Sequence, residues 1–196
     1  MVNLRDFNNA WFQRGRPQWV ELSWIVVSVL LVSSWLPGSA HRRLLLRLFG
    51  ARIGKRVAIK PGVRIKFPWK LSIGSDTWIG EDVWIDNLDR VEIGDNCCVS
   101  QGAYLCTGSH DWGTAAFDLI TRPIKIADGA WIGARAVVAP GTAIGEGTVV
   151  GLGSMVSGNL EPWSIYRSAS AKIVRQRVER SAGTSAPLPL PVQRAQ

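Results

Sequence analysis

The chain has few of the residues from which metal sites and disulfide frameworks are built. Its 196 residues include two histidines, His41 and His110, which disfavours a zinc site that needs several of them. The three cysteines, Cys97, Cys98 and Cys106, are odd in number and lack C-x-x-C spacing. This pattern predicts free thiols, buried in part, in a reducing compartment. We therefore expect no metal cofactor.

Long apolar runs are also absent. The longest, LSWIVVSVLLVSSWL, covers residues 22–36 and is shorter than the roughly 20 residues that span a bilayer. One hypothesis is a helix packed on the rest of the protein or on a neighbouring subunit. A second is a helix at a membrane surface, favoured by flanking arginines and by tryptophans that suit a lipid interface. Cleavage after Ala40 as an export signal is a third, which the acidic Asp6 and Glu21 disfavour.

Acidic residues are outnumbered, 15 against 23 lysines and arginines, and the net charge is +8. A basic protein favours an anionic partner, such as a phosphate-bearing cofactor or an anionic lipid. The basic residues are scattered along the chain, with no recognition helix or stacking platform to organise them. Nucleic acid is therefore not expected as a partner.

A six-residue hydrophobic period runs through most of the sequence. Aliphatic residues begin successive units at Ile53, Ile59, Ile65 and Leu71; Ile73, Ile79 and Ile85; Ile93, Val99 and Leu105; and Ile126, Ile132, Val138, Ile144, Val150 and Val156. One such unit cannot bury its apolar side alone and must stack on the next. The period thus predicts an all-β solenoid, a parallel β-helix with the shape of a triangular prism.

The phase of the period predicts which side chains point inward. Small or short residues follow four positions after most anchors, for example Thr77, Cys97 and Ala103. Because side chains alternate along a strand, these residues share a narrow core with the anchors. We expect an N-terminal apolar and basic helical segment (1–50), the β-helix (51–160), a C-terminal extension with a short helix or tail (161–180), and a disordered Pro-rich tail (181–196).

The period breaks once, after Thr107-Gly108-Ser109-His110-Asp111. Alternation points His110 outward, and Asp111 occupies the next anchor position, which a carboxylate cannot fill. The chain is expected to leave the prism in a loop (111–125) and to return at Ile126. Long loops in compact repeats are often functional, so His110 is a candidate general base, although a structural role stays open. Trp131 also points outward and needs a ligand or a partner to cover it.

At these residues the sequence resembles a known family. The segments SQGAYLCTGSHD and RPIKIADGAWIGARAVVAPGTAIGEG, with FNNAWFQRGRPQW near the N-terminus, are similar to the left-handed β-helix hexapeptide-repeat acyltransferases of the colanic acid biosynthesis type. The resemblance implies a left-handed β-helix, a homotrimer, and acetyl-CoA bound in a groove between neighbouring prisms.

The resemblance also implies roles for individual residues. His110 corresponds to the family's catalytic histidine. The cofactor-binding positions are Trp131, Gly133, Ala134, Leu152, Ser157, Lys172 and Arg175, and the acceptor-binding candidates are Asp86, Asn87 and Asp111. Ser157-Gly158-Asn159 stands where relatives often have Thr-Lys-Asp, so one cation is missing.

The leading functional hypothesis is an O-acetyltransferase that moves acetyl from acetyl-CoA to a sugar hydroxyl in exopolysaccharide biosynthesis. The acceptor would be a sugar or lipid-linked saccharide, and the enzyme would be cytoplasmic, at the inner face of the cytoplasmic membrane if the N-terminal segment contacts lipid. Two alternatives remain: an acetyl-CoA-dependent transferase for an amino sugar or serine, and a non-catalytic trimeric scaffold of a polysaccharide-assembly complex.

Overall fold

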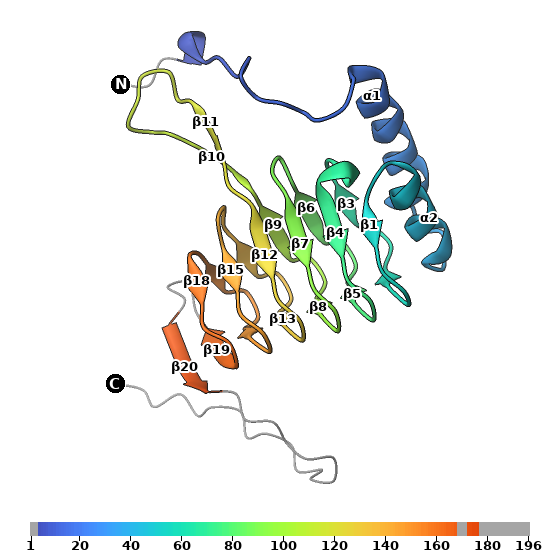
Figure 1. Ribbon diagram of the computed structural model, residues 1–196, viewed down its shortest axis with the longest axis vertical. Helices are drawn as coiled ribbons and strands as arrows, with labels where there is room; N and C mark the ends of the chain where they lie inside the picture. The colour runs from blue at the N-terminus through green and yellow to red at the C-terminus, as the bar shows by residue number, and fades with distance from the viewer. Residues whose placement is uncertain (1–3, 168–171, 177–196) are drawn as a thin grey trace.

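The six-residue period folds into three sheets of short parallel strands that wrap around one narrow core (Figure 1). The computed structural model describes residues 4–167 and 172–176. Sheet A contains β1 (Arg52–Ile53), β4 (Leu71–Ile73), β7 (Val91–Ile93), β12 (Ile124–Ile126), β15 (Ala143–Ile144) and β18 (Asn159–Leu160). Sheet B contains β2 (Ala58–Ile59), β5 (Trp78–Ile79), β8 (Cys98–Val99), β13 (Trp131–Ile132), β16 (Val149–Val150), β19 (Ser164–Arg167) and β20 (Lys172–Gln176). Sheet C contains β3 (Arg64–Ile65), β6 (Trp84–Asp86), β9 (Tyr104–Cys106), β14 (Val137–Val138) and β17 (Met155–Val156).

The phase predicted for the core is confirmed. Parallel pairing stacks like residues of successive coils, as in the column Ile53, Ile73 and Ile93 of sheet A. Every predicted aliphatic anchor is buried, and so are the small residues predicted to face inward. Each coil therefore buries its apolar side against its neighbours, as stacked repeats must.

The cysteines are all free. Cys97 is buried in the core, whereas Cys98 and Cys106 are half-buried. Burial raises the pKa of the Cys97 thiol above its usual value, so this group stays protonated at neutral pH. The Cys97 thiol thus serves the core as a small apolar group.

Helices close the first coil of the prism. We call α1 (Gln18–Val27), the π-helix η2 (Ser28–Val32) and α2 (Ala40–Leu48) together the helical cap. It packs on the prism through three fully buried side chains, Trp24, Val32 and Leu46. Two short 3-10 helices, η1 (Leu4–Asp6) and η3 (Pro68–Lys70), complete the helical elements. No helix in the described part of the chain has the length and apolar character needed to cross a bilayer.

Arginines fix the helical cap in place. Arg42 is fully buried, and its guanidinium donates hydrogen bonds to the carbonyls of Val32, Ser34 and Gly38. Arg43 donates to the carbonyl of Val57, one of the carbonyls that no preceding coil can engage. Several cap arginines therefore satisfy backbone groups, which would otherwise be costly to bury.

The interruption of the repeat differs from the predicted structureless loop. Two antiparallel strands, β10 (Gly108–His110) and β11 (Leu119–Thr121), form a hairpin that projects from the prism. The Arg122 amide donates to the carbonyl of Thr107 and closes its base. The chain thus leaves the prism at Gly108 rather than at Asp111, and it re-enters at the buried Ile124 rather than at Ile126. A paired hairpin satisfies backbone groups that a bare loop would expose.

The C-terminal extension also differs from the prediction, because a strand and not a helix follows Leu160. Strand β19 is a further rung of sheet B, in which Tyr166 pairs with Val150 and fills the core position. Strand β20 then pairs antiparallel with β19 and covers the edge of the sheet. The solenoid therefore extends past residue 160, and the predicted tail (181–196) lies outside the described residues.

Candidate functional site

His110 ends β10, where the hairpin leaves the prism at the corner between sheets C and A. Its imidazole lies parallel to the ring of Phe117, with ring centroids 4.3 Å apart and an interplanar angle of 2°. The ring of Phe7 lies 5.6 Å from it in a tilted arrangement. Two aromatic side chains from different segments thus hold the half-buried imidazole in one orientation.

The hairpin backbone selects the tautomer of His110. The Nδ1 atom lies 2.8 Å from the carbonyl oxygen of Phe117. A carbonyl can only accept a hydrogen bond, so Nδ1 carries the proton and the neutral imidazole keeps its lone pair on Nε2. This arrangement presents Nε2 as a proton acceptor, which is the state a general base requires.

A pocket of about 320 Å³ adjoins His110. One wall comes from the segment before α1, which passes over an edge of the prism between the hairpin and the helical cap (Figure 1). We call this segment, residues 7–16, the N-terminal strap. The remaining wall comes from residues of the prism and the hairpin, among them Lys66, Leu88 and Leu119.

The N-terminal strap is fixed to the prism beside this pocket. The Trp69 indole donates to the Arg14 carbonyl at 2.7 Å, and Lys70 Nζ donates to the Gln13 carbonyl at 3.0 Å. Phe12 stacks on Phe67, with centroids 6.4 Å apart, and lies 4.7 Å from Lys70 Nζ. Burial lowers the pKa of Lys70 from its ordinary value, which reflects its position beneath the strap.

Asp86 lies one coil below the hairpin, in register with Cys106. The Tyr104 hydroxyl donates to Oδ2 at 3.2 Å, and Lys66 Nζ forms an ion pair with Oδ1 at 3.3 Å. Burial, reinforced by the neighbouring Cys106 and Asp86, raises the pKa of the Tyr104 phenol. Tyr104 therefore stays protonated and holds the Asp86 carboxylate at the corner that carries His110.

Asn87 does not have the acceptor-binding role predicted for it. Its side chain is fully buried, and it accepts from the Phe67 amide at 3.0 Å and donates to the Phe67 carbonyl at 2.7 Å. The amide thus links two coils and has no surface left for a ligand. Asp111 shapes the hairpin turn by accepting from the Gly113 amide at 2.8 Å, while its carboxylate stays half-exposed next to His110.

Four predicted cofactor positions meet at another corner, between sheets B and C. Trp131 is 51% exposed, and its indole donates to Ser100 Oγ at 2.9 Å. A Cβ on Gly133 would lie 2.7 Å from the Leu152 nitrogen, so the turn leaves no room for a side chain. The Ala134 carbonyl accepts from the Gly153 amide of the next coil, beside the 75% exposed Leu152. The corner therefore presents two exposed apolar side chains, Trp131 and Leu152, beside a tightly packed turn.

Within one protomer, the predicted catalytic and acceptor-binding residues lie apart from the predicted cofactor-binding residues. His110 and Asp86 lie at the corner of sheets C and A, whereas Trp131, Gly133 and Leu152 lie across sheet C at the corner with sheet B. Ser157 is exposed and follows β17, so it lies on the His110 side of that sheet. Lys172 and Arg175 belong to β20, whose backbone alone is described.

The sequence reasoning missed the contribution of the N-terminal strap and of Phe117. The strap was part of the FNNAWF segment that carried the resemblance, but no hydrophobic period links it to His110 across about a hundred residues. The Phe117 contact depends on the pairing of β10 with β11, which a sequence period of six does not report.

Solved structures agree with the fold. An acetyltransferase with hexapeptide repeats from Vibrio cholerae, VCA0836, superposes with a TM-score of 0.76 at 24% identity, covering 83% of this chain and 93% of that one. Its complex with acetyl-CoA superposes with a TM-score of 0.74, also at 24% identity, covering 83% of this chain and 89% of that one. A galactoside acetyltransferase in complex with coenzyme A has a TM-score of 0.73 at 22% identity, with 81% of each chain covered. These likenesses confirm the left-handed β-helix.

Comparisons of sequence identify the family. Residues 123–158 match the model of the bacterial transferase hexapeptide (six repeats), and residues 70–106 match that of the hexapeptide repeat of succinyl-transferase. WcaF of Escherichia coli K12, named for colanic acid biosynthesis as an acetyltransferase, is 42% identical over 170 residues, covering 86% of this chain and 92% of WcaF. The galactoside O-acetyltransferase of the same organism is 25% identical over 142 residues, covering 71% of this chain and 70% of the enzyme. On this evidence the chain belongs to the hexapeptide-repeat acetyltransferases, of the colanic acid biosynthesis type.

Proposed function

We propose that the protein transfers acetyl from acetyl-CoA to a hydroxyl of a sugar or lipid-linked saccharide during exopolysaccharide biosynthesis. The observation that carries this proposal is the imidazole of His110, whose Nδ1 is bound by the Phe117 carbonyl. Its Nε2 is thereby available to accept a proton next to a pocket of about 320 Å³. The supply of acetyl-CoA points to a cytoplasmic enzyme.

The chemistry follows from the weakness of a sugar hydroxyl as a nucleophile at neutral pH. His110 Nε2 takes the hydroxyl proton while the sugar oxygen bonds to the acetyl carbonyl carbon. The carbon–sulfur bond of the thioester then breaks, and the proton leaves with CoA as its thiol. The products are the O-acetylated sugar and free CoA, and no covalent acyl-enzyme is needed.

The residues at the corner of sheets B and C suit the thioester end of CoA. The exposed Trp131 and Leu152 offer apolar contacts, and Gly133 and Ala134 remain proposed contacts beside them. Ser157, Lys172 and Arg175 remain proposed contacts for the rest of the cofactor. The missing cation at Gly158 leaves Lys172 and Arg175 the larger share of phosphate recognition.

Because one protomer separates these residues from His110, we place the complete site between subunits of a homotrimer. His110 of one protomer would face the Trp131 corner of its neighbour across a groove along sheet C. The acceptor would enter from the side of the N-terminal strap, where Phe7 and Phe12 offer apolar surface to a sugar ring. Asp86 and Asp111 are the proposed polar contacts on this side.

The test is acetyl transfer by the purified protein. Wild-type protein, acetyl-CoA and a lipid-linked or soluble saccharide acceptor should yield a product that is heavier by one acetyl group, detected by mass spectrometry. His110→Ala should lower the rate by about 10²- to 10⁴-fold, the usual contribution of a general base. Binding of acetyl-CoA, followed by calorimetry, should change little.

Ser109→Ala is the matched control, because Ser109 is the preceding residue of the same strand. Its rate should stay close to that of the wild type. Unchanged transfer by His110→Ala would remove the general-base assignment. Wild-type protein that neither binds acetyl-CoA nor acetylates a saccharide would instead support a scaffold role, and transfer to an amine alone would support the amino-sugar alternative.

A further inference from the structure

The helical cap leaves most of its apolar surface uncovered. Helix α1 is apolar around most of its circumference, yet it buries only Trp24. Large exposed apolar residues lie on all parts of the cap: Trp19, Leu22, Ile25, Val26, Val29 and Leu30 on α1 and η2, then Trp35 and Leu36, and Leu44 and Leu48 on α2. Trp19 is 71% exposed and Trp35 is 79% exposed. A continuous apolar surface of this size marks a binding face.

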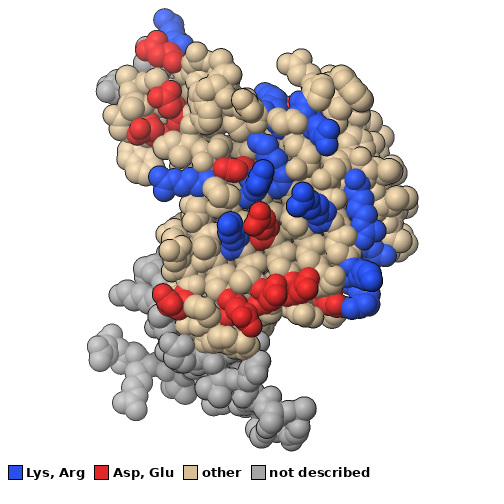
Figure 2. Space-filling model, in the orientation of Figure 1, with Lys and Arg blue, Asp and Glu red and all other residues tan. Residues whose placement is uncertain are grey.

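The same end of the molecule carries the excess positive charge. Residues 18–75, which form the cap and the first coil with its neighbours, contain ten lysines and arginines and one acidic residue, Glu21, which forms an ion pair with Arg14 of the N-terminal strap. Residues 76–196 contain ten basic and thirteen acidic residues. Figure 2 shows a largely uncharged surface over the helices, lysines and arginines beside it with acidic side chains among them, and a row of acidic residues along the lower part of the prism.

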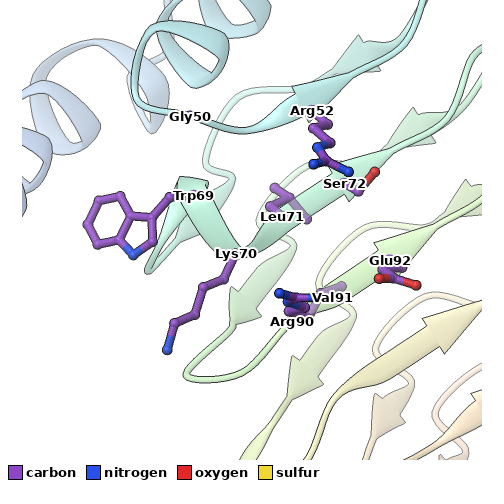
Figure 3. A pocket seen from close by; sticks show the side chains of 9 residues that line it. All are labelled: Gly50, Arg52, Trp69, Lys70, Leu71, Ser72, Arg90, Val91 and Glu92. Carbon is purple, nitrogen blue, oxygen red and sulfur yellow. The ribbon is translucent and has the colours of Figure 1, made fainter. Parts of the chain in front are cut away.

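A basic pocket of about 150 Å³ lies beside the cap, on the outer face of sheet A (Figure 3). Gly50, just after α2, contributes to one wall; Arg52, Lys70 and Arg90 supply three positive charges, against one carboxylate from Glu92. The Lys70 amine is engaged by the carbonyls of Gln13 and Leu88. Arg52 and Arg90 are exposed, and neither forms an ion pair with a residue in the part of the chain that the structure describes.

From these three observations we propose that the helical cap docks on the surface of an anionic phospholipid bilayer. The apolar side chains of α1 and η2 enter the interface, with Trp19 and Trp35 at the two ends of the apolar segment. Arg52 and Arg90 contact headgroup phosphates. The cap lies on the membrane and does not cross it, which agrees with the length of its helices.

Charge complementarity favours a bilayer over a second copy of the chain. Two caps packed face to face would bring two strongly basic ends together, which costs electrostatic free energy. An anionic leaflet attracts the same charges while it accepts the apolar side chains. Docking of this kind requires neither acetyl-CoA nor a saccharide, so it is tested separately from catalysis.

The test is flotation of the full-length protein with vesicles of phosphatidylcholine alone or of phosphatidylcholine mixed with phosphatidylglycerol. The bound fraction should be about tenfold higher on the anionic vesicles and should fall as salt is added. A triple variant, Trp19→Ser with Leu22→Ser and Leu30→Ser, should lower binding by a similar factor. Trp112→Ser, at the 81% exposed hairpin tip, is the matched control and should float like the wild type.

If circular dichroism shows that the triple variant is misfolded, a second variant tests the same proposal. Arg52→Gln with Arg90→Gln should weaken binding to anionic vesicles severalfold and reduce its salt dependence. Wild-type protein that does not float with anionic vesicles would overturn the proposal. So would a triple variant that floats normally but splits a larger assembly in analytical ultracentrifugation, because the cap would then be covered by a second copy.

Discussion

At the scale of single residues, the backbone rather than a carboxylate orients the imidazole of His110. The Phe117 carbonyl holds Nδ1, and the Phe117 ring stacks on the imidazole. A neutral acceptor at Nδ1 fixes the tautomer without adding charge to the site. The orientation of His110 therefore depends on correct pairing of β10 and β11, which sets His110 opposite Leu119 and brings Phe117, two residues earlier, next to the imidazole.

Phe7 is the strap residue that contacts His110, so its replacement should affect the acceptor side alone. We expect Phe7→Ala to raise the KM for the saccharide by about tenfold, because an aromatic wall of the pocket is lost. Initial rates measured over a range of saccharide and acetyl-CoA concentrations would check this. The neighbouring Leu4→Ala is the control, and a rise in the KM for acetyl-CoA instead would contradict the assignment.

Gly133 gives a prediction of stability. A Cβ there would lie 2.7 Å from both the Leu152 nitrogen and the Val150 oxygen, so the backbone of two coils must shift. Gly133→Ala should lower the free energy of unfolding by about 1–3 kcal/mol, measured by urea denaturation. Gly151→Ala is the matched control, since its nearest contact would be 3.2 Å away. Equal losses in both variants would refute the steric explanation.

Alternation along the strands was enough to predict the outward position of Trp131 and the burial of Cys97. The direction of His110 is set instead by the hairpin, which begins at Gly108. Alternation could not predict Asn87, because an asparagine just after a strand suits either a ligand or a backbone partner. Only the contact with Phe67, one coil away, decides between them. Whether a side chain points inward can thus be predicted from its neighbours in the sequence. Its hydrogen-bond partner cannot, because that depends on how the coils stack.

At the scale of elements, the hairpin is an insertion between sheets C and A that the prism does not need. Its ends are joined by the hydrogen bond from the Arg122 amide to the Thr107 carbonyl. The coil before it continues into the coil after it through pairing of β7 with β12. The hairpin can therefore carry function independently of the fold.

Replacement of residues 108–121 by a short glycine linker should separate activity from stability. The melting temperature should stay within about 3 °C of wild type, which corresponds to roughly 1 kcal/mol or less for a chain of this size. Acetyl transfer should fall to the level of His110→Ala. Calorimetry and the transfer assay check both outcomes, and collapse of the melting transition would show that the hairpin belongs to the core.

The regular coils were predictable from the sequence because each one repeats the same burial pattern. The β10–β11 hairpin and the β19–β20 pair were not, because both rest on antiparallel contacts outside the period. The position of the N-terminal strap was likewise hidden, since its partners Trp69 and Lys70 lie more than fifty residues away. The six-residue period predicts which coils stack on one another, but it gives no information on the hairpin, the β19–β20 pair or the N-terminal strap, which pack against the coils from outside.

At the scale of the whole molecule, the N-terminal end of the prism is distinguished by its exposed apolar and basic surface. This end carries the apolar and basic helical cap, and the N-terminal strap connects this cap with the His110 pocket. If the cap docks on a bilayer as proposed, an acceptor held at the membrane surface would lie near the strap side of that pocket. The arrangement of the protein suits a substrate that is anchored in lipid.

The central claim is that acetyl transfer uses His110 of one protomer and the Trp131 corner of its neighbour. The most direct measurement is subunit complementation between His110→Ala and Ala134→Trp, in which the tryptophan fills the cofactor corner. Each variant alone should be inactive while still forming trimers. When the two are co-expressed and purified as mixed trimers, each trimer contains one interface with both wild-type residues, so activity should return to about one third of wild type. Mixed trimers that remain as inactive as either parent would contradict a site shared between subunits.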